Sequence, residues 1–227
     1  MNFWDHLAEL RNRLIKVVVC FCIAFIAVYP FHAFLQKILF KPAEGIIPKL
    51  KYIEVSEAFL VHVNLTLIAA LVIVLPFALW QFWRFVEPAL FAHEKNIIVK
   101  NFGFSLLMFC LGVLFAYYII LPYSLHFFMS YQTQELTADI TLRNYISFSS
   151  FLILAGGLGF QIPIIIIILI MTGAISRTFF CRQRKIVFVL LLIVSAILTP
   201  PDPLTMLILA IPLYLLFELS LLITYRF

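Results

Sequence analysis

Charged residues are scarce in this chain. Asp, Glu, Lys and Arg make up 12% of its 227 residues, whereas hydrophobic residues make up 64%. A soluble globular domain is nearer a quarter charged and half apolar, and the mean hydropathy here is +1.10. A separate water-soluble domain would need at least ~50 residues of ordinary composition, and the chain contains no such stretch. We therefore expect an all-α membrane protein in which residues 1–227 form one polytopic domain.

The sequence also lacks the short motifs of several enzyme and cofactor classes. It contains neither a G-x-x-x-x-G-K-[ST] phosphate loop nor an H-E-x-x-H zinc motif. Its four cysteines form no C-x-x-C pair, which disfavours a disulfide framework or a zinc site. The net charge of +5 does not indicate a nucleic-acid partner, because in a membrane protein the placement of Lys and Arg matters more than their total. We expect no enzymatic activity, no cofactor or metal, and no nucleic-acid partner.

Long apolar runs are what the chain has in abundance. A bilayer-crossing helix needs about 20 residues, and six candidate spans lie at residues 14–35, 58–82, 102–121, 146–171, 186–198 and 204–223. We expect the third span to end at Pro122. The fifth gives only about 20 Å of helix, and the three prolines within residues 199–203 prevent it from continuing. We therefore expect spans five and six to form a short hairpin, around which the bilayer thins.

The fourth span contains the glycines Gly156, Gly157 and Gly159. They do not form a dinucleotide-binding loop, because they lie mid-span and no strand precedes them. Small residues in a membrane helix let a neighbouring helix approach closely. We therefore expect a close helix contact here.

The distribution of basic residues predicts the orientation of the chain. With six spans, both termini lie on the same side, and eleven of the sixteen Lys and Arg residues fall on that side. Because cytoplasmic segments carry an excess of Lys and Arg, we expect both termini in the cytoplasm.

Two carboxylates are candidates for a binding site on the cytoplasmic side. Glu9 lies in residues 5–14, where leucines recur at helical spacing ahead of the first span, and Glu94 lies in the charged and aromatic loop after the second span. Two such groups would suit a ligand with two guanidinium groups, since arginine and carboxylate form paired, charge-assisted hydrogen bonds. Two alternatives stay open: Glu9 could pair with Arg13 four residues later, and Glu94 could pair with Arg84 or Lys95.

Three further polar residues lie in or beside the spans. Gln161 needs a partner in the bilayer, and an interhelical hydrogen bond is the simplest expectation. Glu218 is expected near the cytoplasmic end of the last helix, within reach of the interface. Asp202, held among prolines, is expected to cap the sixth helix.

Several motifs, in order along the chain, resemble the TatC family, which forms the core of the twin-arginine protein translocase. Residues 6–14 resemble its H-L-x-E-L-R-x-R-L signature, and residues 81–94 resemble its first cytoplasmic loop. The third span and the last hairpin also match, at Phe109, Gly112, Phe115, Tyr117, residues 198–202, residues 210–212, Phe217 and Glu218. The resemblance covers residues 5–218.

This resemblance implies a cup-like bundle of six helices that recognises the signal peptides of folded precursor proteins. In the family, carboxylates matching Glu9 and Glu94 dock two consecutive arginines, and residues matching Phe85, Gln81 and Arg11 belong to or adjoin that site. The implied partners are TatA-type and TatB-type single-span subunits, other copies of the chain and membrane lipid, with the proton-motive force driving export. The implied location is the bacterial cytoplasmic (inner) membrane, with an organelle-encoded membrane protein as the alternative.

The chain departs from the family pattern at two positions. Gln161 stands where many members carry a glutamate, and Met206 stands where a glutamine is common, although Thr199 is kept. An amide can form hydrogen bonds but cannot titrate, which excludes a proton relay through Gln161. The rival functional class is a small-solute or ion transporter, which is often built from inverted repeats with broken helices. No convincing correspondence between the two halves of this chain supports it, and a purely structural scaffold is the third alternative.

Overall fold

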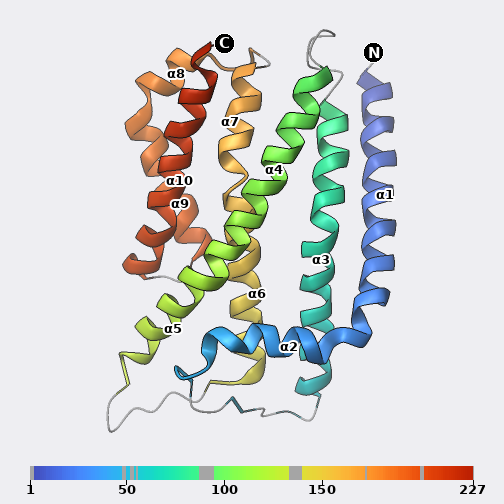
Figure 1. Ribbon diagram of the computed structural model, residues 1–227, viewed down its shortest axis with the longest axis vertical. Helices are drawn as coiled ribbons and strands as arrows, with labels where there is room; N and C mark the ends of the chain where they lie inside the picture. Colours follow the sequence, from blue (N-terminus) through green and yellow to red (C-terminus); the bar gives the residue numbers. More distant parts are fainter. Residues whose placement is uncertain are drawn as a thin grey trace.

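A computed structural model describes residues 3–47, 50–51, 54, 56–86, 95–132, 140–171, 173–199 and 202–226. Almost all of this described part is helical (Figure 1). The main helices are α1 (Phe3–Val28), α2 (His32–Phe40), α3 (Glu57–Val86), α4 (Lys95–Phe115), η4 (Ala116–Ile120), α5 (Leu121–Met129), α6 (Leu142–Gly159), α7 (Ile162–Met171), α8 (Arg177–Arg182), α9 (Arg184–Leu198) and α10 (Pro203–Ile223). Three short 3-10 turns add η1 (Tyr29–Phe31), η2 (Lys41–Ala43) and η5 (Thr224–Arg226).

Five helical stretches of the described part are long and apolar enough to cross a membrane. They are Leu7–Ala43, Glu57–Phe85, Phe102–Met129, Leu142–Met171 and Pro203–Ile223. The remaining candidate, α9, has 15 residues, or about 22 Å of helix. The expected short hairpin therefore holds for α9 only, since α10 has 21 residues, or about 32 Å. The count of six spans stays a prediction, with α9 as the short member.

Both termini lie at one end of the molecule (Figure 1). We call this the terminal end and the opposite one the distal end. A cytoplasmic location of the terminal end stays a prediction from the distribution of basic residues.

The first span differs from its predicted range. Residues 14–35 were expected to form one helix, but α1 ends at Val28 and a 3-10 turn containing Pro30 redirects the chain. The next helix, α2, then runs across the distal ends of the other helices instead of continuing along α1 (Figure 1). Proline lacks the N–H that a continuing helix needs and crowds the preceding turn, so the direction changes at Pro30.

The third span also differs from the prediction, which ended it at Pro122. Helix α4 passes through one π-helical segment, η4, into α5, and Pro122 lies in the first turn of α5. Proline has no N–H to donate to the turn before it, yet the helical chain continues through this position. The wider π turn precedes it and absorbs the change of register.

The centre of the bundle is formed by α6 and α7, against which α3, α4 and α10 pack. In the most apolar 18-residue stretch of Leu142–Met171, 67% of the residues are buried, whereas in the corresponding stretch of the first span 0% are buried. Helix α1 lies at the edge of the bundle (Figure 1), packs mainly against α3 and leaves most of its side chains exposed.

The predicted close helix contact is confirmed between α4 and α6. A Cβ atom placed on Gly112 would lie 2.5 Å from the carbonyl oxygen of Gly156, and one on Gly156 would lie 2.5 Å from the Cβ of Ala116. Distances this short are not found between real Cβ atoms and their neighbours, so the two backbones approach as closely as the absence of side chains permits.

Polar contacts tie the distal end together. The carboxylate of Glu57, which is buried at the start of α3, accepts a hydrogen bond of 2.9 Å from the backbone N–H of Arg143 at the start of α6. The backbone N–H of Lys51 donates to Ile140, and that of Leu142 donates back to Lys51. The first N–H groups of a helix have no acceptor within that helix. Glu57, on a different helix, supplies the acceptor for the N–H of Arg143.

Candidate functional site at the terminal end

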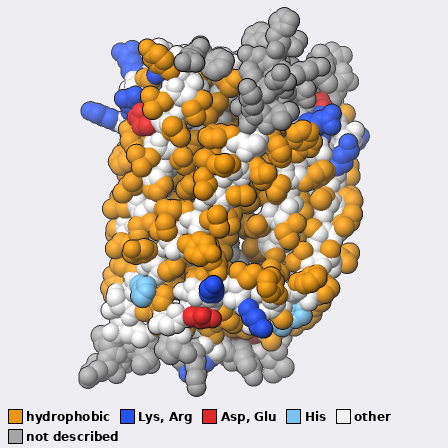
Figure 2. Space-filling view, viewed as in Figure 1, with side chains coloured by type: hydrophobic (Ala, Val, Ile, Leu, Met, Phe, Trp, Pro, Cys, Tyr) orange, Lys and Arg blue, Asp and Glu red, His pale blue; other side chains and the backbone are white. Residues whose placement is uncertain are grey.

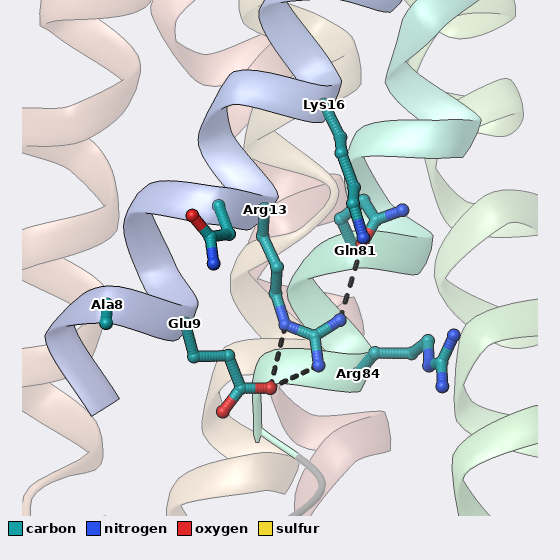
Figure 3. A pocket seen from close by; sticks show the side chains of 7 residues that line it. Ala8, Glu9, Arg13, Lys16, Gln81 and Arg84 are labelled. Carbon is teal, nitrogen blue, oxygen red and sulfur yellow. Dashed lines mark hydrogen bonds and ion pairs between the residues drawn. The ribbon is translucent and has the colours of Figure 1, made fainter. Parts of the chain in front are cut away.

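A pocket of about 520 Å³ opens at the terminal end between α1 and α3 (Figure 3). Its lining residues are Ala8, Glu9, Asn12, Arg13, Lys16, Gln81 and Arg84. The α1 members are spaced three or four residues apart in two adjacent rows, so they share one helix face. The sequence predicts Arg13 only as a partner of Glu9, and it does not predict Asn12, Lys16 or Arg84 in the site. The helical spacing places Asn12 and Lys16 on the same face of α1 as Glu9 and Arg13.

Arg13 is the central side chain of the pocket. Its Nε donates a hydrogen bond of 3.0 Å to Oε1 of Glu9, and its Nη2 forms an ion pair with the same oxygen. Its Nη1 donates to Oε1 of Gln81 on α3, at 3.3 Å (Figure 3). The pairing of Glu9 with Arg13, one of the two alternatives for Glu9, is therefore present. Both side chains are mostly buried, with 22% and 17% exposed, so the pair is less screened than one on an open surface.

The described lining of the pocket carries more positive than negative charge. Arg13, Lys16 and Arg84 contribute cations, and Glu9 is the one acidic residue among the described residues that line it. Glu94, the second predicted carboxylate, lies outside the described residues. A dicationic ligand would need at least one further carboxylate to balance this lining.

Two other predicted site residues lie beside this pocket or away from it. Phe85 borders an adjoining apolar pocket of about 200 Å³, which shares Arg13 and Gln81 with the first. Arg11 is exposed and lies on neither lining. The structure therefore brings Glu9, Gln81 and Phe85 together and leaves Arg11 on another face of α1.

Gln161 forms the expected interhelical hydrogen bonds. The hydroxyl of Ser105 on α4 donates to Oε1 of Gln161 at 2.7 Å, and Nε2 of Gln161 donates to the backbone oxygen of Ser105 at 3.0 Å. Both residues are buried, and Gln161 lies at the break between α6 and α7. The amide therefore joins the broken helix to α4 where the bilayer offers no water to satisfy it.

Replacing Ser105 by alanine should destabilise this junction. The substitution removes the donor to Oε1 of Gln161 and leaves a buried acceptor without it. We expect a loss of about 0.6–1.7 kcal/mol, which spans the average and the largest value from double-mutant cycles in a membrane protein. Thermal unfolding of the purified protein in detergent measures the effect. The double variant Ser105→Ala/Gln161→Leu, which removes both partners, should recover part of the loss. Equal unfolding midpoints for Ser105→Ala and the unmodified chain would contradict the role of this contact.

Asp202 caps α10, as expected from its place among prolines. Its Oδ1 accepts a hydrogen bond of 2.7 Å from the backbone N–H of Thr205, and the hydroxyl of Thr205 donates to its other oxygen. Thr199 is buried, and its hydroxyl donates to the backbone oxygen of Ser195 in the last turn of α9 at 2.8 Å. Thr199 therefore bonds to a carbonyl in the last turn of α9, and Asp202 accepts from an N–H in the first turn of α10.

Glu218 has two partners near the terminal end. Its Oε2 lies 3.2 Å from Nη2 of Arg184, at the start of α9, and its Oε1 accepts a hydrogen bond of 3.0 Å from the Tyr214 hydroxyl. About 29% of its side chain is exposed, which fits the expectation of a carboxylate near the interface. Glu218 and Glu9 lie on separate parts of the bundle.

A family model described as Sec-independent protein translocase protein (TatC) matches residues 5–212. The chain belongs to the TatC family. A TatC protein of Haemophilus influenzae is 36% identical over 221 residues, covering 96% of this chain and 86% of its own length. One of Aquifex aeolicus is 36% identical over 224 residues, covering 97% of this chain and 93% of its own length.

The fold matches a solved TatC structure as well. A crystal structure of the twin-arginine translocase receptor TatC in DDM superposes with a TM-score of 0.85, at 35% sequence identity, covering 96% of this chain and 98% of that one. A second crystal structure of the same receptor gives a TM-score of 0.83, also at 35% identity, covering 97% of this chain and 98% of its own. The predicted all-α membrane fold is thereby confirmed.

Membership of the TatC family establishes the general function. The chain is a component of the Sec-independent, twin-arginine protein translocase, a multi-pass protein of the bacterial inner membrane. Proteins of this family are translocase subunits and not enzymes, which agrees with the motifs that the sequence lacks.

Proposed function

We propose that this chain is the core subunit that recognises twin-arginine signal peptides and docks their arginine pair at the terminal-end pocket, with Glu9 as one anchor and Glu94 as the other. The main support is the contact between Glu9 and Arg13. One carboxylate oxygen already accepts two guanidinium nitrogens in a largely buried position. The Glu9 carboxylate therefore has the geometry that binds a guanidinium group, and the second anchor would supply the further negative charge that the lining needs.

We assign this pocket to the cytoplasm, on the distribution of basic residues. A precursor folded in the cytoplasm would then meet it first, and its cargo would be exported by the proton-motive force after assembly with TatA-type and TatB-type single-span subunits and with further copies of this chain. A small-solute or ion transporter is the alternative, but transporters bind substrate near the membrane midplane. The polar pocket described here lies at one end of α1 and α3, which favours a ligand presented at the membrane surface.

Binding of a labelled twin-arginine signal peptide to the purified protein in nanodiscs tests this proposal. A twin-lysine peptide keeps both charges but lacks the planar fork of the guanidinium, so we expect it to bind more weakly. The substitutions Glu9→Gln and Glu94→Gln should each weaken binding of the twin-arginine peptide by about tenfold or more, which corresponds to ~1.4 kcal/mol.

The variant Glu44→Gln provides a matched control. It makes the same chemical change at an exposed residue of the distal end, and we expect unchanged binding. Should both peptides bind alike, or should Glu9→Gln bind like Glu44→Gln, the docking site is not at Glu9.

A further inference from the structure

Two apolar pockets follow the contact between α1 and α3 inward from the terminal-end pocket. The first adjoins the terminal-end pocket and shares Arg13 and Gln81 with it. The second lies further along both helices and shares Val17 and Ala78 with the first. Neighbouring pockets therefore share one residue from each helix, and all three are continuous. We call the two apolar pockets together the α1–α3 seam, which extends over residues 10–21 of α1 and residues 71–85 of α3.

The α1–α3 seam is apolar except where it meets the terminal-end pocket. Arg13 and Gln81 are its only polar residues among the described ones that line it, and the others are Ala, Val, Leu and Phe. On the right-hand side of Figure 2, where α1 lies, Lys and Arg side chains are visible near the terminal end, and hydrophobic side chains cover the middle of the molecule. A ligand that enters from the terminal end therefore meets charged side chains first and an apolar surface next.

The hydrogen bond between Arg13 and Gln81 lies at the boundary between the two kinds of lining. An α-helix turns by about 100° per residue, which places Arg13 between Glu9, on the side of the terminal-end pocket, and Leu14, on the side of the seam. Nη1 of Arg13 donates to Gln81 from α1 to α3, while its Nε donates to Glu9 (Figure 3). A ligand guanidinium that replaces Arg13 on Glu9 would therefore also release the contact at this boundary.

The ligand proposed for the terminal-end pocket has the same order of chemistry as this surface. A signal peptide has a positively charged region followed by an apolar stretch of about 7–15 residues. With the arginine pair at Glu9, the residues that follow it leave the pocket beside the seam. From Arg13 to Phe21, α1 rises about 12 Å, the length of about four residues of an extended chain. The seam therefore matches the first part of the apolar stretch.

We propose that the α1–α3 seam binds the first apolar residues that follow the arginine pair of a signal peptide. This inference rests on the proposed docking of the arginine pair at Glu9. It adds a second requirement for recognition, because a peptide with two arginines and a polar continuation would fill the terminal-end pocket and leave the seam without a ligand. Ala78 is the residue of α3 that both apolar pockets share, so a larger side chain there obstructs the seam at its middle.

Binding of two labelled peptides to the purified protein in nanodiscs tests this proposal. The apolar peptide contains the arginine pair and its apolar stretch, and in the serine peptide the first four apolar residues are serine. The variant Ala78→Phe should weaken binding of the apolar peptide by about tenfold or more, the order expected when one large apolar side chain loses its pocket. It should leave binding of the serine peptide unchanged, which also shows that the variant is folded.

The matched control is Ala27→Phe, which adds the same side chain at an exposed position of α1 outside the seam. It should bind both peptides like the unmodified chain. Equal binding of the apolar peptide to Ala78→Phe and Ala27→Phe would overturn the proposal.

Crosslinking to the unmodified chain locates the apolar stretch without any substitution. A benzophenone group on the second apolar residue of the peptide should react with residues 10–21 of α1 or residues 71–85 of α3, and mass spectrometry of the digested protein identifies the position. Crosslinks confined to other helices would show that the apolar stretch lies elsewhere and that the seam faces only lipid.

The variant Glu9→Gln distinguishes a failure of this inference from a failure of the proposed function. If Glu9→Gln weakens binding of both peptides and Ala78→Phe weakens neither, the arginine pair docks at Glu9 and the seam assignment alone is wrong. If Glu9→Gln weakens neither, docking at Glu9 is wrong, and the inference that rests on it is overturned as well.

Discussion

Replacing Gly156 by alanine should destabilise the protein by about 1–3 kcal/mol, the usual cost of overpacking a close-packed interior. The new Cβ would lie 2.5 Å from the Cβ of Ala116 and 2.9 Å from the backbone oxygen of Gly112. Neither neighbour is the end of a flexible side chain, so α4 and α6 must separate. Because α6 lies at the centre of the bundle, the separation also disturbs the contacts of α3. The unfolding midpoint of the purified protein measures this loss.

Gly103→Ala is the matched control for that experiment. Gly103 is an exposed residue of the same helix α4, and a Cβ placed on it would meet no described atom within 4 Å. Alanine favours a helix over glycine by up to about 1 kcal/mol, so this variant should be neutral or slightly more stable. A Gly156→Ala protein as stable as Gly103→Ala would mean that the α4–α6 contact is looser than the structure indicates.

Replacing Arg13 by glutamine should tighten the binding of a twin-arginine signal peptide. In the free protein the guanidinium of Arg13 is bound to the carboxylate of Glu9. An arginine of the signal peptide has to displace it to reach that carboxylate. Removing this competitor also removes one cation from a pocket lined by three. We expect about tenfold tighter binding, equivalent to ~1.4 kcal/mol, which is the order of one charge-assisted hydrogen bond. Titration of the labelled peptide into the protein in nanodiscs gives the dissociation constant.

A second variant separates competition from simple charge. Arg84→Gln removes a cation from the same lining, but Arg84 forms no hydrogen bond with Glu9 (Figure 3); it should tighten binding less than Arg13→Gln and lose its effect at high salt. Lys185→Gln, outside the pocket, should change nothing. Weaker binding to Arg13→Gln would show that Arg13 positions Glu9 for the peptide and does not compete with it.

The sequence was sufficient to predict much of the fold because hydrophobicity over about 20 residues determines where a helix crosses a bilayer. Residues 58–82 were expected for the second span, and α3 covers Glu57–Val86. The predicted Asp202 cap and the close contact at Gly156 were also correct, since each depends on a local residue type with few conformational alternatives. The direction of the chain after Val28 was not predictable, because a proline near the end of an apolar run can kink a helix or end it.

The candidate site was predicted only in part. The sequence identified Glu9 and Gln81 through motif and position, and it identified Arg13 as a possible partner of Glu9. It did not identify the pocket, because the lining comes from two helices whose facing residues are 68 positions apart in the Arg13–Gln81 bond. Spacing along α1 groups its polar residues by face, but which of these faces meets α3 depends on how the two helices pack. Arg13 meets Gln81 of α3, whereas Arg11 is exposed on another face.

The sequence by itself determined that this is an all-helical membrane protein, where most spans lie, and which family it belongs to, because these follow from composition and from motifs read along the chain. Only the tertiary structure decided that Arg13 pairs with Glu9, that Gln161 bonds to Ser105, and that Glu57 accepts a hydrogen bond from the first turn of α6. Each of these contacts joins residues from different elements or selects one partner among several. Burial in a medium without water then makes every such polar partner necessary.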